Sequence, residues 1–168
     1  MNIQDIQLIY EYNYWANKNI LAASAQVTQE QFAAPGSFPY GGLHGTLFHV
    51  LEAEWSWRAL FQKLAGASEL AELVPAEYAA LQTLENRWRE EETAMRAYIA
   101  GLRDEDIESH LRYTTDTGIE RDRILWHCLF HVVNHGTQHR SEAAALLTDH
   151  GQSPGDIDFP VFLNERQK

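Results

Sequence analysis

Four long segments of this chain repeat apolar residues every three to four positions, and residues that stop helices separate the segments. The segments run from about Ile3 to Ala25, His44 to Leu64, Ala76 to Leu102 and Asp122 to His150. Each such helix has one apolar stripe, and four stripes are buried when the helices pack against one another. The pattern therefore predicts an all-α fold, a four-helix bundle.

The connections between these segments carry signals of their own. The stretch APGSFPYGG, residues 34–42, breaks the first helical pattern, and Gly66 is placed to end the second. Residues 112–122 are polar and β-branched, which indicates a short hairpin, and the apolar tail at residues 156–163 is expected to pack back against the bundle. Because 168 residues suffice for one core, we expect a single domain over residues 1–168.

Charge and composition exclude several classes of function. The formal net charge is -11, and the 13 Lys and Arg residues are scattered, so no nucleic-acid partner is expected. No apolar run approaches the roughly 18 residues that a membrane span needs, so we expect a soluble protein. The lone Cys128 cannot form an internal disulfide, and the amphipathic N-terminus does not resemble an export signal, which favours the cytoplasm.

The last helical segment contains WHCLFHVVNHGTQHR, which places His127, His131, His135 and His139 four residues apart. On a helical wheel His139 falls on the apolar face and His135 on its near edge, whereas His131 is marginal and His127 lies outside. The inward pair has Cβ atoms about 5 to 6 Å apart, a spacing that lets two imidazoles reach one metal ion. A histidine pair at this spacing also occurs on solvated helix faces, so the pair alone does not decide between a metal site and an exposed pair.

A third ligand has to come from another helix, and the second segment offers His49 within LFHVLEAEW, on the rim of the apolar stripe. Histidines that face inward from two packed helices form a metal site typical of helix bundles. Three neutral imidazoles leave one coordination position open, as in catalytic zinc sites. Taken alone, His49 fits a hydrogen-bonded edge histidine better than a metal ligand.

Four ordered segments of the sequence resemble the DinB family, the DinB/YfiT-like metalloenzymes. They are YNYWANKNIL in the first helical segment, LFHVLEAEWSW in the second, HVVNHGTQHR in the fourth and GDIDFPVFL near the end. The resemblance covers most of the chain and implies a bundle in up-down-down-up order. It also implies a site for one divalent metal ion, with the ligands carried over onto His49, His135 and His139.

The sequence departs from the family directly after the second histidine of the last motif. It reads RSEAAALL where family members often have Arg-Gly-Gln, so Ser141 and Glu142 replace small and amide groups. Glu142 lies near the metal-binding face of the wheel, which makes it a candidate for proton transfer or for supporting a ligand. The alternative is a partly exposed helical glutamate without a role.

The resemblance implies metal-dependent chemistry on thiols, including transfer of a low-molecular-weight thiol cosubstrate to an electrophile. Our first hypothesis is a metal-dependent enzyme acting on a small molecule, a thiol-dependent S-transferase or a related hydrolase or isomerase. Zinc or nickel suits imidazole ligands best, and manganese or iron are alternatives. The second hypothesis is a non-catalytic metal-binding module in stress response or protein interaction.

Aromatic residues left over outside the predicted core faces bear on assembly. Phe48, Trp55, Trp126 and Phe130 are expected to lie away from these faces. Exposed aromatic patches often mark protein interfaces, and members of the resembled family are frequently homodimers. We therefore expect a homodimer.

Overall fold

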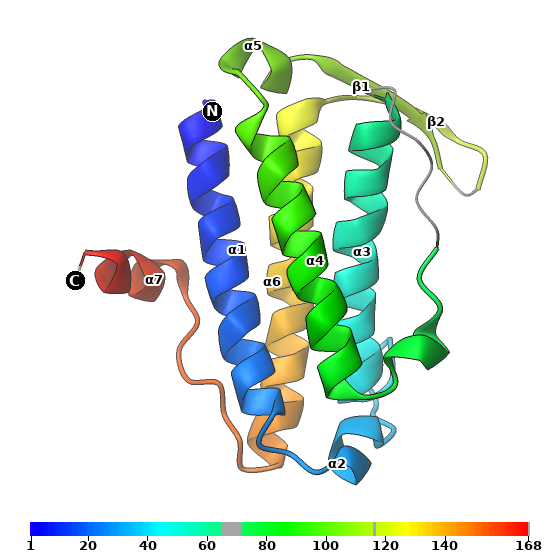
Figure 1. Ribbon diagram of the computed structural model, residues 1–168, viewed down its shortest axis with the longest axis vertical. Helices are drawn as coiled ribbons and strands as arrows, with labels where there is room; N and C mark the ends of the chain where they lie inside the picture. Colours follow the sequence, from blue (N-terminus) through cyan, green and yellow to red (C-terminus); the bar gives the residue numbers. More distant parts are fainter. Residues whose placement is uncertain (65–71, 116, 168) are drawn as a thin grey trace.

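The computed structural model describes residues 1–64, 72–115 and 117–167, which are mostly helical with one small two-stranded sheet. The long helices are α1 (Ile3–Ser24), α3 (Leu43–Leu64), α4 (Leu81–Ala100) and α6 (Leu125–Asp149). They lie side by side, α1 and α6 running in one direction and α3 and α4 in the other (Figure 1). Both α1 and α3 pack against α4 and against α6, so α6 presents one face to α1 and another to α3.

Shorter elements connect the long helices and close the ends of the bundle. They are α2 (Gln29–Ala33), η1 (Pro75–Tyr78), α5 (Asp104–Ile107), β1 (His110–Thr114), β2 (Glu120–Ile124) and α7 (Phe159–Arg166). The antiparallel strands form the predicted hairpin at one end of α6 (Figure 1). The prediction for the tail is also confirmed, because α7 packs on α1 and the Phe159 ring meets Tyr12 edge to face at 5.3 Å.

Two predicted helix starts are wrong, in each case because a tertiary contact overrides the local pattern. The last long helix begins at Leu125 rather than Asp122, since residues 120–124 pair with β1 and the Leu125 N–H donates to the Ser109 carbonyl at 2.9 Å. The third begins at Leu81 rather than Ala76. The helix end expected at Gly66 lies outside the described residues.

Residues 75–78 form the separate turn η1, which is held against α3. The ring of Tyr78 stacks on Phe48 with centroids 6.1 Å apart, and its carbonyl oxygen lies 3.0 Å from Nε2 of His44. This contact also corrects the prediction for Phe48, which is only 7% exposed. Of the other three aromatics expected outside the core, Phe130 is 44% exposed, and Trp55 and Trp126 are half-buried. Among the described residues, no helix combines the length and apolar character that a membrane span requires.

A buried polar network joins all four long helices. Nη1 of Arg140 on α6 donates to the side-chain oxygens of Asn13 and Asn17 on α1, at 2.6 and 2.7 Å. The amide nitrogens of the same asparagines donate to Oε1 of Glu54 on α3, at 2.8 and 2.9 Å, and Trp88 on α4 donates to Oε2 at 2.9 Å. Two amides thus bridge a cation and a carboxylate that are almost fully buried.

Burial acts against both charges of this network. It raises the pKa of Glu54 and lowers the pKa of Arg140, while the charge of each residue opposes the shift of the other. Gly136 on α6 makes room for the guanidinium, because a Cβ atom there would lie 2.7 Å from Nη1 of Arg140. The network therefore constrains how α1, α3, α4 and α6 are aligned.

Candidate metal centre

The packing of α3 against α6 brings together the three histidines that the sequence singled out. His49 comes from α3, and His135 and His139 lie one turn apart on α6. Their potential ligand atoms all lie within 4.8 Å of one another, and the two Nε2 atoms of His49 and His135 are 3.1 Å apart. Ring centroids of the three pairs are separated by 4.5 to 4.9 Å.

This donor set fits a divalent metal ion. Two imidazole nitrogens bound to one tetrahedral zinc ion are about 3.3 Å apart, because each Zn–N bond is about 2.0 to 2.1 Å long. The 3.1 Å separation between His49 and His135 is close to this value. Without an ion the same separation suits one hydrogen bond between the rings, which engages only two of the three histidines. The convergence of a third ring is better explained by a shared ligand.

Carboxylates lie near two of the rings, and one of these carboxylates orients its ring through a hydrogen bond. Oε2 of Glu142 lies 2.7 Å from Nδ1 of His139, so Nε2 is the nitrogen of that ring left to bind a metal. Oε2 of Glu52 lies 3.9 Å from Nδ1 of His49, which is beyond hydrogen-bond distance. Glu142 is thus more than an exposed helical residue, because it contacts a metal-ligand candidate directly.

Tyr40 contacts the cluster from a turn within residues 34–42. The sequence did not single out Tyr40 as a residue of the site. Its ring stacks on His49 with centroids 3.4 Å apart and planes 12° apart, and it meets His139 edge to face at 5.3 Å. A hydrogen bond from the Gly41 N–H to the Phe38 carbonyl closes the turn, in which Gly41 has φ +81. The YGG letters indicated a turn but not its contact with the histidines.

The cluster is electrostatically prepared to bind a cation. Burial first, and then proximity to His139, lower the pKa of His49 to about 4. The pKa of His135 is lowered to about 4 by burial first, and then by His139 and His49. Both rings are therefore unprotonated near neutral pH, the state in which imidazole binds metals.

The other two histidines of the row lie outside the cluster. His127 is exposed and packs against Trp126, with ring centroids 4.0 Å apart, as expected for a residue off the apolar face. His131 is also exposed, and its ring lies 5.2 Å from Trp57 and 5.7 Å from His135. The structure thus divides the row of four as the helical wheel did.

A cavity of about 510 Å³ adjoins the cluster and gives it access to a small molecule. His49 and His135 line it together with Trp55, Trp57 and Glu52. Its lining comes mainly from α3, and residues 72–73 and His135 of α6 complete it. A ligand in it would therefore reach two of the three histidines.

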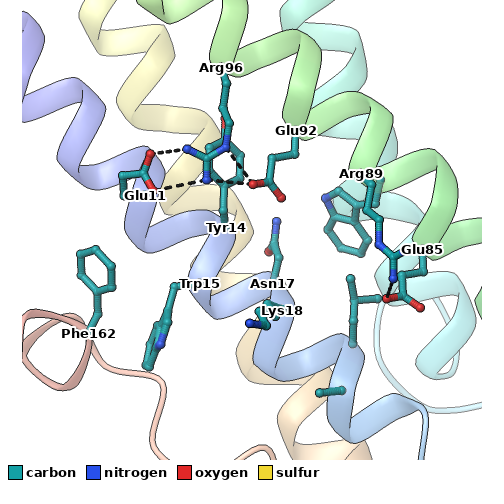
Figure 2. Close-up of a pocket in the computed structure, with 13 residues that line it drawn as sticks. Glu11, Tyr14, Trp15, Asn17, Lys18, Glu85, Arg89, Glu92, Arg96 and Phe162 are labelled. Carbon is teal, nitrogen blue, oxygen red and sulfur yellow. Dashed lines mark hydrogen bonds and ion pairs between the residues drawn. The ribbon is translucent and has the colours of Figure 1, made fainter. Parts of the chain in front are cut away.

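A second cavity, of about 550 Å³, lies between α1 and α4 and contains none of the three histidines (Figure 2). Its arginines are already paired: Arg96 with Glu11 and Glu92, and Arg89 with Glu85. Figure 2 shows these pairs among the side chains that line the cavity. Because the arginine charges are already neutralised, this cavity offers less chemistry than the one beside the histidines.

The fold and the site first define a class: a mostly helical protein whose long helices bring three histidines to a possible metal site. The model of the DinB family matches residues 1–168, and the chain belongs to this family. It is 27% identical to Protein DinB of Bacillus subtilis (strain 168) over 161 residues, 92% of this chain and 91% of that protein. The family resemblance seen in the sequence is confirmed.

A solved structure is similar in fold. The crystal structure of the conserved protein of locus from Enterococcus faecalis matches with a TM-score of 0.63 at 12% identity. The match covers 84% of this chain and 94% of that chain. At this identity the likeness shows the fold alone.

Proposed function

We propose that this protein is a divalent-metal-dependent enzyme acting on a small molecule, a thiol-dependent S-transferase or a related hydrolase or isomerase. The observation that carries the proposal is the convergence of three histidines, with ligand atoms within 4.8 Å of one another, beside a cavity of about 510 Å³. Three imidazoles suit zinc or nickel best, with manganese or iron as alternatives. A low-molecular-weight thiol is the proposed cosubstrate.

The cavity favours an enzyme over a non-catalytic metal-binding module. A metal ion that only stabilised the bundle would need neither a cavity nor an open coordination position. Here His49 and His135 line a cavity, and three ligands leave the fourth position of a tetrahedral site open. The low count of cations and the net charge of -11 also weigh against a nucleic-acid partner.

The residues of the site have separate proposed tasks. A divalent ion, when bound, would lower the pKa of a thiol or water and so supply a nucleophile near neutral pH. His49, His135 and His139 hold that ion through unprotonated ring nitrogens. Glu142 accepts the Nδ1 proton of His139 and thereby directs the opposite nitrogen toward the site.

The nucleophile is proposed to come from a substrate or from water. Cys128 on α6 is buried, and burial raises the pKa of its thiol above the usual range. Such a thiol is a poor nucleophile near neutral pH. Among the described residues that line the cavity beside the histidines, none is a serine, cysteine or lysine paired with a general base.

The test combines metal analysis with a screen of thiols against electrophiles. Elemental analysis of the purified protein should find one divalent ion per chain, and turnover should disappear on chelation and in His139→Ala. Loss of turnover in Glu142→Gln at unchanged metal content would assign Glu142 to proton transfer or to support of the His139 ring. If the fully metal-loaded protein shows no metal-dependent turnover in the screen, the non-catalytic module becomes the better interpretation.

Two further family features are proposed for this chain. The up-down-down-up order of the bundle is supported by the directions of the long helices (Figure 1). A homodimer is supported by the 44% exposed Phe130 and the half-buried Trp126 one turn before it on α6. Light scattering should return twice the chain mass of 19.2 kDa, and a mass near 19.2 kDa would contradict the dimer.

A further inference from the structure

The groove between α3 and α6 continues past the histidines toward the hairpin. The cavity beside His135 and a further cavity of about 370 Å³ both include Trp57 in their walls. The further cavity ends at the hairpin, where Tyr113 of β1 and Arg123 of β2 line it opposite His127 of α6. Because His127 precedes His135 by eight positions on α6, the two cavities together extend about 12 Å along the helix.

Aromatic rings line this path without a break. The Trp57 ring lies 5.2 Å from His131 and 5.7 Å from Tyr113, and His131 lies 5.7 Å from His135. At the far end, Nε of Arg123 donates to the Tyr113 hydroxyl at 3.3 Å, which holds the guanidinium at the wall of the cavity. A ligand with an apolar body would be in contact with rings from one end to the other.

The two ends of the path differ in charge. In the part of the chain that the structure describes, no carboxylate pairs with Arg123, whereas Arg112 on the facing strand pairs with Asp122. At the other end, the carboxylates of Glu52 and Glu72 line the cavity beside the histidines. An anionic group is therefore favoured at the hairpin end and disfavoured beside the carboxylates.

We propose that this groove binds a small organic carboxylate lengthwise, with the carboxylate on Arg123 and the opposite end of the molecule at His49 and His135 of the histidine cluster. The guanidinium matches a carboxylate through two parallel hydrogen bonds. Trp57 lies between the two ends and packs against the body of the molecule. The inference deepens the proposed function by naming the substrate class, and only the histidine end of the site depends on that function.

The test uses ω-mercaptoalkanoic acids of increasing chain length, each compared with its uncharged amide, titrated into the zinc-loaded protein by calorimetry. The acid of best-fitting length should bind about tenfold more tightly than its amide, because one charge-assisted pair is lost in the amide. Arg123→Gln should remove this preference. Arg121→Gln, which removes an equal charge from the same strand outside this cavity, should keep it.

Two results would overturn the subsite: equal binding of acid and amide by the wild type, or an equal loss of preference in Arg123→Gln and Arg121→Gln. Parallel titrations with unsubstituted alkanoic acids and the metal-free protein separate this inference from the metal site. If the metal-free protein prefers acids and this preference depends on Arg123, the carboxylate site at Arg123 is supported even if zinc does not bind. Tight zinc binding without an acid preference overturns the subsite and leaves the metal proposal intact.

Discussion

His139 and Arg140 are neighbours on α6, yet their side chains enter two polar clusters of opposite kind. Arg140 faces α1, where Asn13 and Asn17 accept from Nη1 and link it to Glu54. His139 faces α3, where one of its ring nitrogens and one from each of the other two histidines lie within 4.8 Å of one another. The charges and amides of the first cluster are hydrogen-bonded to one another, with Nε of Arg140 left without a partner among the described residues, and the second cluster adjoins a cavity.

This difference separates structure from function on one helix. Buried polar groups in folded proteins are almost always paired, and the Glu54 carboxylate, the two asparagine amides and Nη1 of Arg140 pair with one another within the protein. The converging nitrogens of His49 and His135 have low pKa values, and one hydrogen bond between these two rings does not engage the third histidine. The Arg140 network therefore constrains the alignment of the helices, and the histidine cluster is the one whose nitrogens could hold a metal ion.

The largest expected effect on stability comes from breaking the buried network around Arg140. Arg140→Met should lower the free energy of unfolding by about 3 to 5 kcal/mol, because it leaves the Glu54 carboxylate buried without a compensating cation. Urea denaturation measures this loss. The control is Arg89→Met, whose partner Glu85 lies on the surface of α4 and which should cost less than about 1 kcal/mol. Similar losses in both variants would contradict the distinction.

Breaking the three-histidine cluster should affect metal binding rather than folding. His139→Ala should weaken zinc binding at least about 100-fold, or about 2.8 kcal/mol, because two imidazoles cannot replace three. The metal-free variant should lose much less unfolding free energy than Arg140→Met. Calorimetric titration with zinc is the measurement, and the exposed His127→Ala should bind zinc like the wild type.

Metal removal tests the same comparison between the Arg140 network and the histidine cluster. Chelation should lower the melting temperature without unfolding the protein, since the core and the Arg140 network remain. Free metal at 100 times its dissociation constant adds about 2.7 kcal/mol to stability, which sets the scale of the change. Differential scanning calorimetry with and without chelator measures it. Complete unfolding on chelation would show that the histidine cluster is also structurally essential.

Changing Glu142, whose carboxylate contacts His139, should affect zinc affinity less than removing a histidine. Glu142→Gln should weaken zinc binding about tenfold, or about 1.4 kcal/mol, because the neutral amide supports the His139 ring less strongly. Glu52→Gln is the matched control, since its carboxylate lies 3.9 Å from His49 and is 47% exposed. Equal affinities in the two variants would remove Glu142 from the site.

The smallest expected effect on stability comes from filling the space beside the Arg140 guanidinium. An alanine at a helical glycine usually gains up to about 1 kcal/mol, but at Gly136 its Cβ would meet Arg140 and Asn13 at 2.7 and 3.1 Å. Because hydrogen bonds hold both groups, Gly136→Ala should cost about 1 kcal/mol net in urea denaturation. Gly101→Ala, with its nearest contact at 3.5 Å, should be neutral or stabilising. A gain at Gly136 would show that the network can shift.

The periodicity of the sequence by itself predicted the long helices and which histidines face inward. This information is local, because the face of a helix on which a residue lies depends only on its neighbours along the chain. His135 and His139 are one turn apart, so their adjacency followed directly from the sequence. The choice of His49 came from its own wheel and from the family resemblance.

Only the tertiary structure decided which faces meet. Glu54 and Arg140 are 86 positions apart, and no local pattern shows that Asn13 and Asn17 connect them. The contact of Tyr40 with His49 likewise depends on how a loop folds over α3. The start of α6 at Leu125 depends on pairing between two strands. In each case the deciding interaction joins segments far apart in the chain, and a pattern read along the chain does not contain it.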